Sequence, residues 1–158
     1  FEYQNLVVKV VKDTEHETEV TVSVTVRNVG SREGKEVVQC YVHAPDTSTV
    51  YRPEHELVAF AKTRLLAPDE TETVTLTLSS KAFAFWDIGH NAWTVESGAY
   101  EIRLGATSRN IVAQQSVTIL SGRPASTKAQ QSHPPRQQAA VPAIRNVTDE
   151  TFTRMLGR

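Results

Sequence analysis

The sequence predicts an all-β fold: an antiparallel β-sandwich of about seven strands, followed by an extended linker and a short helix. Three segments carry most of this prediction, because apolar and polar residues alternate in them with the period of a strand that has one buried face. These segments are residues 20–26, 73–78 and 100–104. No long helical pattern separates them, and clusters of Gly, Pro, Asn and Asp mark turns between the strands.

Four other apolar segments bring the number of strands to about seven. They are residues 6–11, 36–43, 56–66 and 111–119, and residues 93–95 form a short extra strand. Strands of this length and spacing, spread over roughly 100 residues, are typical of sandwiches of the immunoglobulin or fibronectin III type. We therefore expect one such domain over residues 1–120.

The turn from Asn28 to Gly34 joins two of these strands and is expected to set their register. Gly30 and Gly34 are available there for a positive φ, which other residues adopt with difficulty. The strand that follows is apolar on both faces, since Val37 and Tyr41 lie opposite its core positions. Such an outer face is covered by the chain's own tail, is buried against a partner, or reflects only the strand propensity of valine.

The chain changes character after the last predicted strand. Residues 121–145 are rich in Pro, Gln and Ala and predict an extended linker that does not fold on its own. Residues 146–158 predict a short amphipathic helix whose apolar stripe needs a surface to lie on. The charge changes as well, since residues 1–120 carry 11 basic and 16 acidic side chains and residues 121–158 carry six and two.

Composition excludes several classes of function. A net charge of −1 gives no basic footprint for nucleic acid, and no stretch of 18 apolar residues predicts a membrane partner. The single cysteine, Cys40, rules out an internal disulfide and is expected to be a buried apolar residue. We expect no metal or other cofactor, since the candidate metal ligands lack a typical spacing. Those candidates are His43, Asp46, His55 and His90.

Several motifs, taken in order, resemble one family. They are "FEYQNL" (1–6), "VTVRNVGSREGKEVVQCYV" (24–42), "YRPEHELVAFAKTRLLAPDETETVTLTL" (51–78), "FAFWD" (83–87) and "WTVESGAYEIRLGATSRNI" (93–111). These blocks resemble the C-terminal fibronectin type III-like domain of glycoside hydrolase family 3 enzymes, the β-glucosidases and their relatives. The resemblance covers about residues 1–119.

The resemblance implies a non-catalytic role. In that family the nucleophile and the acid/base residue come from catalytic domains upstream of this segment, and no residue here matches either motif. The chain is therefore expected to be part of a longer β-glucosidase-like hydrolase of carbohydrate metabolism. Its expected partners are the catalytic domains of the same polypeptide, which it stabilises. Asp69 stands where the family usually has Gly, which favours a type I turn over a type II turn at Pro68-Asp69.

The resemblance also places one long polar loop against the catalytic domains. Its candidate domain-interface or active-site-rim residues are Tyr51, Arg52, Pro53, Glu54 and Glu56. Long loops on rigid sheets are also where binding residues concentrate.

Two alternatives stay open: a stand-alone carbohydrate-binding module, and a protein-interaction sandwich unrelated to sugars. Trp86 and Trp93 are the candidate sugar-stacking residues for the first alternative. The favoured interpretation of these two tryptophans is that they pack in the sandwich core or at a domain seam. No residue is assigned a catalytic role.

Overall fold

The computed structural model of the chain describes residues 1–122, which fold into nine β-strands and one short 3₁₀ helix. The strands are β1 (Glu2–Thr14), β2 (Glu17–Arg27), β3 (Val37–His43), β4 (Glu56–Lys62), β5 (Thr71–Ser79), β6 (Ala84–Asp87), β7 (Ala92–Val95), β8 (Gly98–Thr107) and β9 (Asn110–Ile119), with η1 (Ser80–Ala82) between β5 and β6. The expected all-β class is confirmed. The predicted linker from residue 123 onward and the predicted helix over 146–158 lie outside the described residues.

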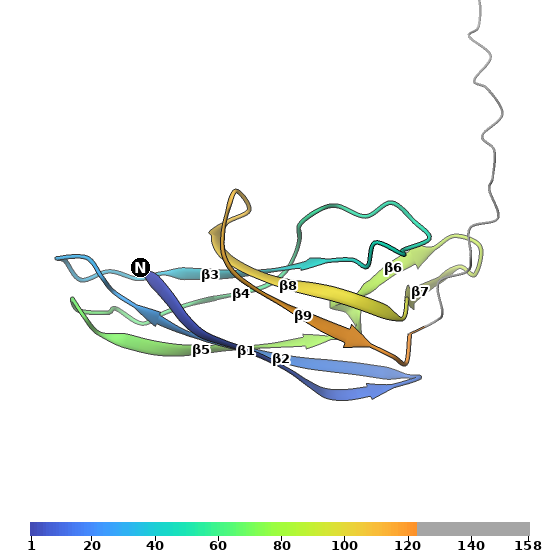
Figure 1. Cartoon of the computed structure of the whole chain (residues 1–158), viewed down its shortest axis with the longest axis horizontal. Helices are drawn as coiled ribbons and strands as arrows, with labels where there is room; N and C mark the ends of the chain where they lie inside the picture. The colour runs from blue at the N-terminus through green and yellow to red at the C-terminus, as the bar shows by residue number, and fades with distance from the viewer. Residues whose placement is uncertain (123–158) are drawn as a thin grey trace, which may run out of the picture. The chain divides into compact units, whose positions relative to one another are not determined.

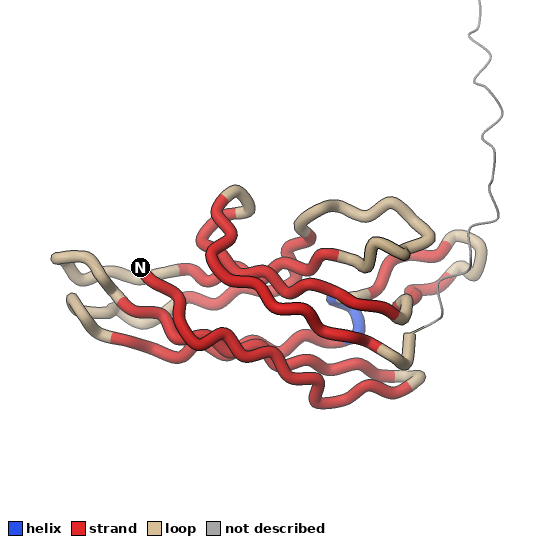
Figure 2. The backbone as a smooth tube through the Cα atoms, viewed as in Figure 1, coloured by secondary structure: helices blue, strands red, loops and turns tan. Residues whose placement is uncertain are grey.

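Two antiparallel sheets face each other across the core (Figure 1). One has the strand order β1-β2-β5 and the other the order β4-β3-β8-β9. β6 and β7 form a separate two-stranded hairpin, so seven strands build the two main sheets and two lie outside them. Figure 2 shows how little of the described chain is helical. None of its helices is long and apolar enough to span a membrane.

The core consists of the inward residues of both sheets, as the period-two patterns predict. Alternate residues of β2, β5 and β8 are buried and their neighbours face outward. The buried residues of these strands are Val20, Val22, Val24, Val26, Val74, Leu76, Leu78, Tyr100, Ile102 and Leu104. β3 contributes Val38, Cys40 and Val42 to the same cluster. The residues expected to face the core in these strands are therefore confirmed.

Three elements differ most from the expectation. β1 begins and ends beyond the predicted range and contains a register shift near Asn5, which has a φ of 53°. β4 ends at Lys62, and the chain then leaves the sheet before Leu66 forms an isolated bridge with Gly34. β6 was not expected as a strand, because its Ala-Phe-Trp-Asp sequence has no alternation that predicts one.

The turn from Asn28 to Gly34 is held by a buried amide. Nδ2 of Asn28 donates to the carbonyl oxygens of Arg32 and Leu66, at 2.8 Å each, and Oδ1 accepts from the backbone N–H of Gly30 at 3.0 Å. Gly30 and Gly34 were available for a positive φ, but neither adopts one. Gly34 instead packs close to the Phe1 ring, from which an added Cβ would lie 3.3 Å.

The turn at Pro68-Asp69 also corrects an expectation. Asp69 has a φ of 64°, which excludes the predicted type I geometry and matches the sign that a type II turn needs. Two contacts hold Asp69 in this conformation. Its N–H donates to the Asn28 carbonyl at 2.8 Å, and its carboxylate accepts from Nη2 of Arg27 at 2.7 Å. Asp and Asn tolerate the left-handed region better than most residues with a side chain.

The outer face of β3 is covered by the chain itself. Tyr41 is only 4% exposed, and its ring meets the His55 ring edge-on at a centroid distance of 6.0 Å. Its hydroxyl donates to Oε1 of Gln39. His55, in the loop between β3 and β4, therefore supplies cover for Tyr41 on this face. Tyr41 is not available for a partner.

Candidate functional site

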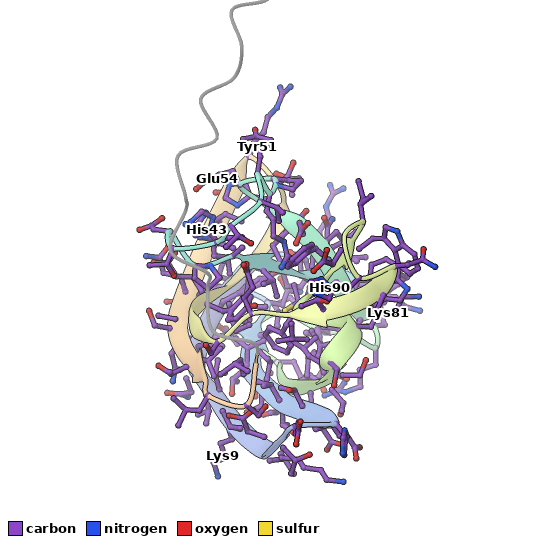
Figure 3. The ribbon with its side chains drawn as sticks, turned by 90° about the vertical axis from the view of Figure 1, so that its right-hand side faces the viewer. Lys9, His43, Tyr51, Glu54, Lys81 and His90 are labelled. Carbon is purple, nitrogen blue, oxygen red and sulfur yellow. The ribbon has the colours of Figure 1, made fainter. Side chains whose placement is uncertain are left out.

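The candidate site is the loop that joins β3 to β4, residues 44–55, together with the residues that hold it in place. Tyr51 is 97% exposed, and Figure 3 shows it on the loop with Glu54 and His43 nearby. Pro53 is exposed as well. An aromatic ring this accessible leaves water only when another molecule or domain covers it.

Arg52 follows Tyr51 directly but has the opposite environment. Its side chain is only 5% exposed and forms an ion pair with Glu56. Nη1 donates to the carbonyl oxygen of Phe83 at 2.7 Å, and Nη2 lies 3.4 Å from that of Ala84. Since a guanidinium presents several donors in a fixed plane, one side chain fastens the loop to the start of the β6–β7 hairpin.

Glu96 holds the other half of the loop. It is 4% exposed, and its carboxylate accepts from the hydroxyl of Ser48 at 2.7 Å and from the backbone N–H of Thr49 at 3.0 Å. The Thr49 hydroxyl donates to it as well. Next to it, Gly98 lies against Pro45, where an added Cβ would be 2.8 Å from the proline ring. The backbone at 98 therefore approaches the loop more closely than any side chain would permit.

The environment of Glu96 predicts a dependence of stability on pH. Burial raises the pKa of Glu96, but hydrogen bonds from Thr49 and Ser48, with the Arg52 charge, bring this pKa below its ordinary value of 4.5. A carboxyl group with a lowered pKa stabilises the fold above its unfolded pKa, and this contribution disappears as the pH falls through the folded value.

We expect the Glu96→Gln substitution to lower the free energy of unfolding at pH 7, and its difference from wild type to shrink at about pH 3.5. Urea unfolding at the two pH values measures this. Glu15→Gln, the same change at an exposed turn residue, is the control and should stay within about 0.5 kcal/mol of wild type. A Glu96→Gln difference that is independent of pH would contradict the assignment.

A cluster of charges joins the end of the loop to β8. Nη1 of Arg103 lies 2.7 Å from Oε1 of Glu54, and its Nη2 lies 2.7 Å from Oε2 of Glu101. Nδ1 of His43 lies 3.6 Å from Oε2 of Glu54. The hydrogen bond from Arg103, together with the His43 charge, lowers the pKa of Glu54. Within residues 1–122, no group of three or more His, Cys, Asp or Glu side chains is placed to hold a metal ion.

The predicted rim residues thus divide into two sets. Tyr51, Pro53 and Glu54 face solvent, whereas Arg52 and Glu56 form a partly buried pair that supports the loop. Glu96 and Arg103 support the loop too, and sequence reasoning did not assign them to it. Their partners in the loop lie 47 or more residues away in the chain, so no local pattern signals these contacts.

Trp86 and Trp93 are directly paired across the β6–β7 hairpin. Their rings meet edge-to-face at a centroid distance of 5.7 Å and an interplanar angle of 76°. Of the two favoured expectations, packing in the sandwich core is wrong, because Trp86 is 46% and Trp93 is 61% exposed, and packing at a domain seam stays a prediction. The hairpin lies outside both main sheets, so its two tryptophan rings lie at the surface of the domain.

Cys40 is fully buried in the core, as expected. Burial raises the pKa of its thiol to about 12. A thiol of this kind is neutral and inert at physiological pH. It therefore contributes packing and no chemistry.

The family comparison identifies the fold that carries this loop. Residues 36–108 match the model of the fibronectin type III-like domain. This part of the chain is a fibronectin type III-like domain. The match includes the loop at 44–55 and the β6–β7 hairpin.

Curated relatives of the fibronectin type III-like domain are glycosidases of much greater length. The chain is 45% identical to thermostable β-glucosidase B of Acetivibrio thermocellus over 121 residues, which are 77% of this chain and 16% of that protein. It is 43% identical to an exo-α-(1→6)-L-arabinopyranosidase of Bifidobacterium breve over 99 residues, 63% of this chain and 13% of that enzyme. The chain thus spans less than a fifth of the length of these relatives.

A solved structure of similar fold agrees with these relatives. β-Glucosidase 3B from Thermotoga neapolitana, in complex with α-D-glucose, superposes with a TM-score of 0.69 at 38% identity, over 77% of this chain and 16% of that one. The expected resemblance to the C-terminal fibronectin type III-like domain of glycoside hydrolase family 3 β-glucosidases is therefore confirmed.

Proposed function

We propose that this fibronectin type III-like domain is a non-catalytic part of a β-glucosidase-like glycoside hydrolase. In this role it stabilises the catalytic domains of the same polypeptide and presents the loop at 44–55 to the rim of the active site. The glycosidases that contain a matching domain support this proposal, since in each of them the domain is a small fraction of the protein.

One observation carries the assignment of the loop. Glu96 binds the loop at Thr49, and Arg52 binds it to Phe83. Tyr51 lies between Thr49 and Arg52 in the chain, yet it is 97% exposed. A fixed backbone lowers the entropy lost on binding, and a tyrosine ring supplies a large contact area with few rotatable bonds. The combination favours a preformed contact surface.

The carboxyl groups at the end of the loop and the start of β4 favour a structural role over a catalytic one. A glycosidase needs two carboxyl groups that flank the bond, and one of them must be a general acid with a raised pKa. Glu54 has a lowered pKa and pairs with Arg103, and Glu56 pairs with Arg52. Both groups are therefore held as structural carboxylates.

The test uses the longer protein that carries this domain. Tyr51→Ala should raise KM for a β-glucoside about 3- to 10-fold, with little change in Tm, because the exposed ring supports little of the fold. Phe60→Ala is the control, since Phe60 is an exposed aromatic residue that lies on β4 and outside the loop. Deletion of residues 1–122 should lower the Tm or the folding yield of the catalytic domains.

Two results would contradict the proposal. One is a deletion that leaves both the stability and the activity of the longer protein unchanged. The other is turnover of an aryl glucoside by purified residues 1–158 at an ordinary enzymatic rate, about 1 s⁻¹ or faster.

A further inference from the structure

A cleft lies at the end of the sandwich where the β1–β2 turn approaches the β6–β7 hairpin. Its volume is about 580 Å³, within the range of about 300 to 1,000 Å³ that is usual for ligand sites. Residues 14–18, Ser80, residues 93–95 and residues 121–122 line it. None of these belongs to the loop at 44–55, so the cleft is separate from the candidate rim.

The chemistry of the walls narrows the class of ligand. Trp93 and Val95 are the large apolar residues of the lining, and hydroxyl, carboxyl, imidazole and backbone groups make up the rest. The described lining contains no Lys or Arg, whereas Glu15 and Glu17 both contribute to it. An anionic ligand is disfavoured by these charges, and a largely apolar one would leave the polar walls unpaired.

Several walls of the cleft are fixed by bonds within the protein. The hydroxyl of Ser80 accepts from the backbone N–H of Thr18 at 2.7 Å, and the hydroxyl of Thr14 accepts from that of Glu17 at 3.1 Å. The backbone N–H of Ser121 donates to Oδ1 of Asp13 at 3.2 Å. These bonds join three separate segments of the chain, so the cleft exists before a ligand enters.

Trp93 supplies the stacking surface. Its ring is 61% exposed, and the Trp86 ring braces it edge-to-face at 5.7 Å. A pyranose ring has an apolar C–H face and a rim of hydroxyl groups. A surface complementary to it therefore combines an aromatic ring with hydrogen-bonding groups. Trp93 offers the first, and the lining residues Glu15 and Glu17 supply carboxylate acceptors for sugar hydroxyls, Glu17 with its Oε2 also paired to Lys12.

We propose that this cleft binds a neutral oligosaccharide, with one sugar ring stacked on Trp93 and its hydroxyls directed to the β1–β2 turn. This site does not depend on the proposed role of the loop at 44–55. It lies within one chain and requires no catalytic domain. In a glycoside hydrolase it would hold a distant part of a polysaccharide chain.

The composition of the chain gives a direct measurement. Trp86 and Trp93 are its two tryptophans, so tryptophan fluorescence reports on this hairpin alone. In the Trp86→Phe variant, Trp93 is the single emitter. Titration of residues 1–158 carrying Trp86→Phe with cellotetraose should give a saturable change in emission, with a Kd of about 0.1 to 10 mM for such an open site.

A pair of variants locates the binding. Measured by calorimetry or NMR shifts with cellotetraose, Trp93→Ala should weaken binding at least 10-fold, and the exposed aromatic control Phe60→Ala should change it less than 2-fold. Circular dichroism confirms that each variant is folded. No saturable signal up to about 20 mM cellotetraose would overturn the proposal. So would binding that survives Trp93→Ala, or a cleft that becomes buried against another domain of the longer protein.

Discussion

Asn28→Ala is expected to lower the free energy of unfolding by about 2 kcal/mol. The substitution removes both amide donors and the amide acceptor, which leaves the carbonyls of Arg32 and Leu66 and the N–H of Gly30 without this partner. The Leu66 carbonyl keeps a bond from the Gly34 N–H at 3.0 Å, and the Arg32 and Gly30 bonds are only partly buried, so each lost hydrogen bond counts for about 0.5 to 1.5 kcal/mol. Urea or thermal unfolding of residues 1–158 measures the loss.

Asn28→Asp separates the two halves of this network. It keeps an acceptor for Gly30 but removes both donors, and it places a charge at a position that is 3% exposed. It should therefore be as destabilising as Asn28→Ala or more so. A loss below about 1 kcal/mol for both variants would show that the buried amide does not hold the two turns together.

Arg52→Met is expected to destabilise the domain by about 2 to 4 kcal/mol, the second large effect. Met keeps an unbranched apolar chain in the buried site but removes every donor. It leaves Glu56 without its ion pair, and loss of one partner of a buried pair is strongly destabilising. Chemical unfolding gives the free energy, and loss of order at 48–54 should appear as faster amide hydrogen exchange there.

Arg64→Met is the matched control. Arg64 pairs with Glu70 at 2.6 Å, but the two side chains are 52% and 38% exposed, so this pair should contribute less than about 1 kcal/mol. Equal effects of Arg52→Met and Arg64→Met would contradict the anchoring role. In the longer protein, Arg52→Met should also raise KM, because it releases the loop that carries Tyr51.

The sequence was informative wherever a strand has one buried and one exposed face. The core-facing residues of β2, β5 and β8 were predicted correctly, because burial of one face imposes a period of two on the residue types. β6 was missed for the same reason. It belongs to a hairpin outside the main sheets, and no buried face imposes alternation on its four residues.

The site was harder to predict than the fold. Tyr51 and Pro53 are exposed on the loop where they were expected, and their role at a domain interface or rim stays a prediction. Nothing local distinguishes the buried Arg52 from a solvated arginine. Apart from Glu56, its partners are backbone carbonyls 31 and 32 residues further along the chain, and backbone carbonyls are the same in every residue type, so the sequence does not reveal them. The positive φ of Asp69 was missed for a similar reason. Its carboxylate accepts from Arg27 at the end of β2, and its N–H donates to Asn28 in the turn after β2, so both partners are distant in the sequence.

The burial of Cys40 makes the domain its own reporter of unfolding. The chain has one thiol, which is fully buried and neutral at physiological pH. An alkylating reagent therefore reaches it only in molecules whose two sheets have separated. The labelling rate then gives the frequency of that opening for wild type and for every variant above, without denaturant and without an added probe.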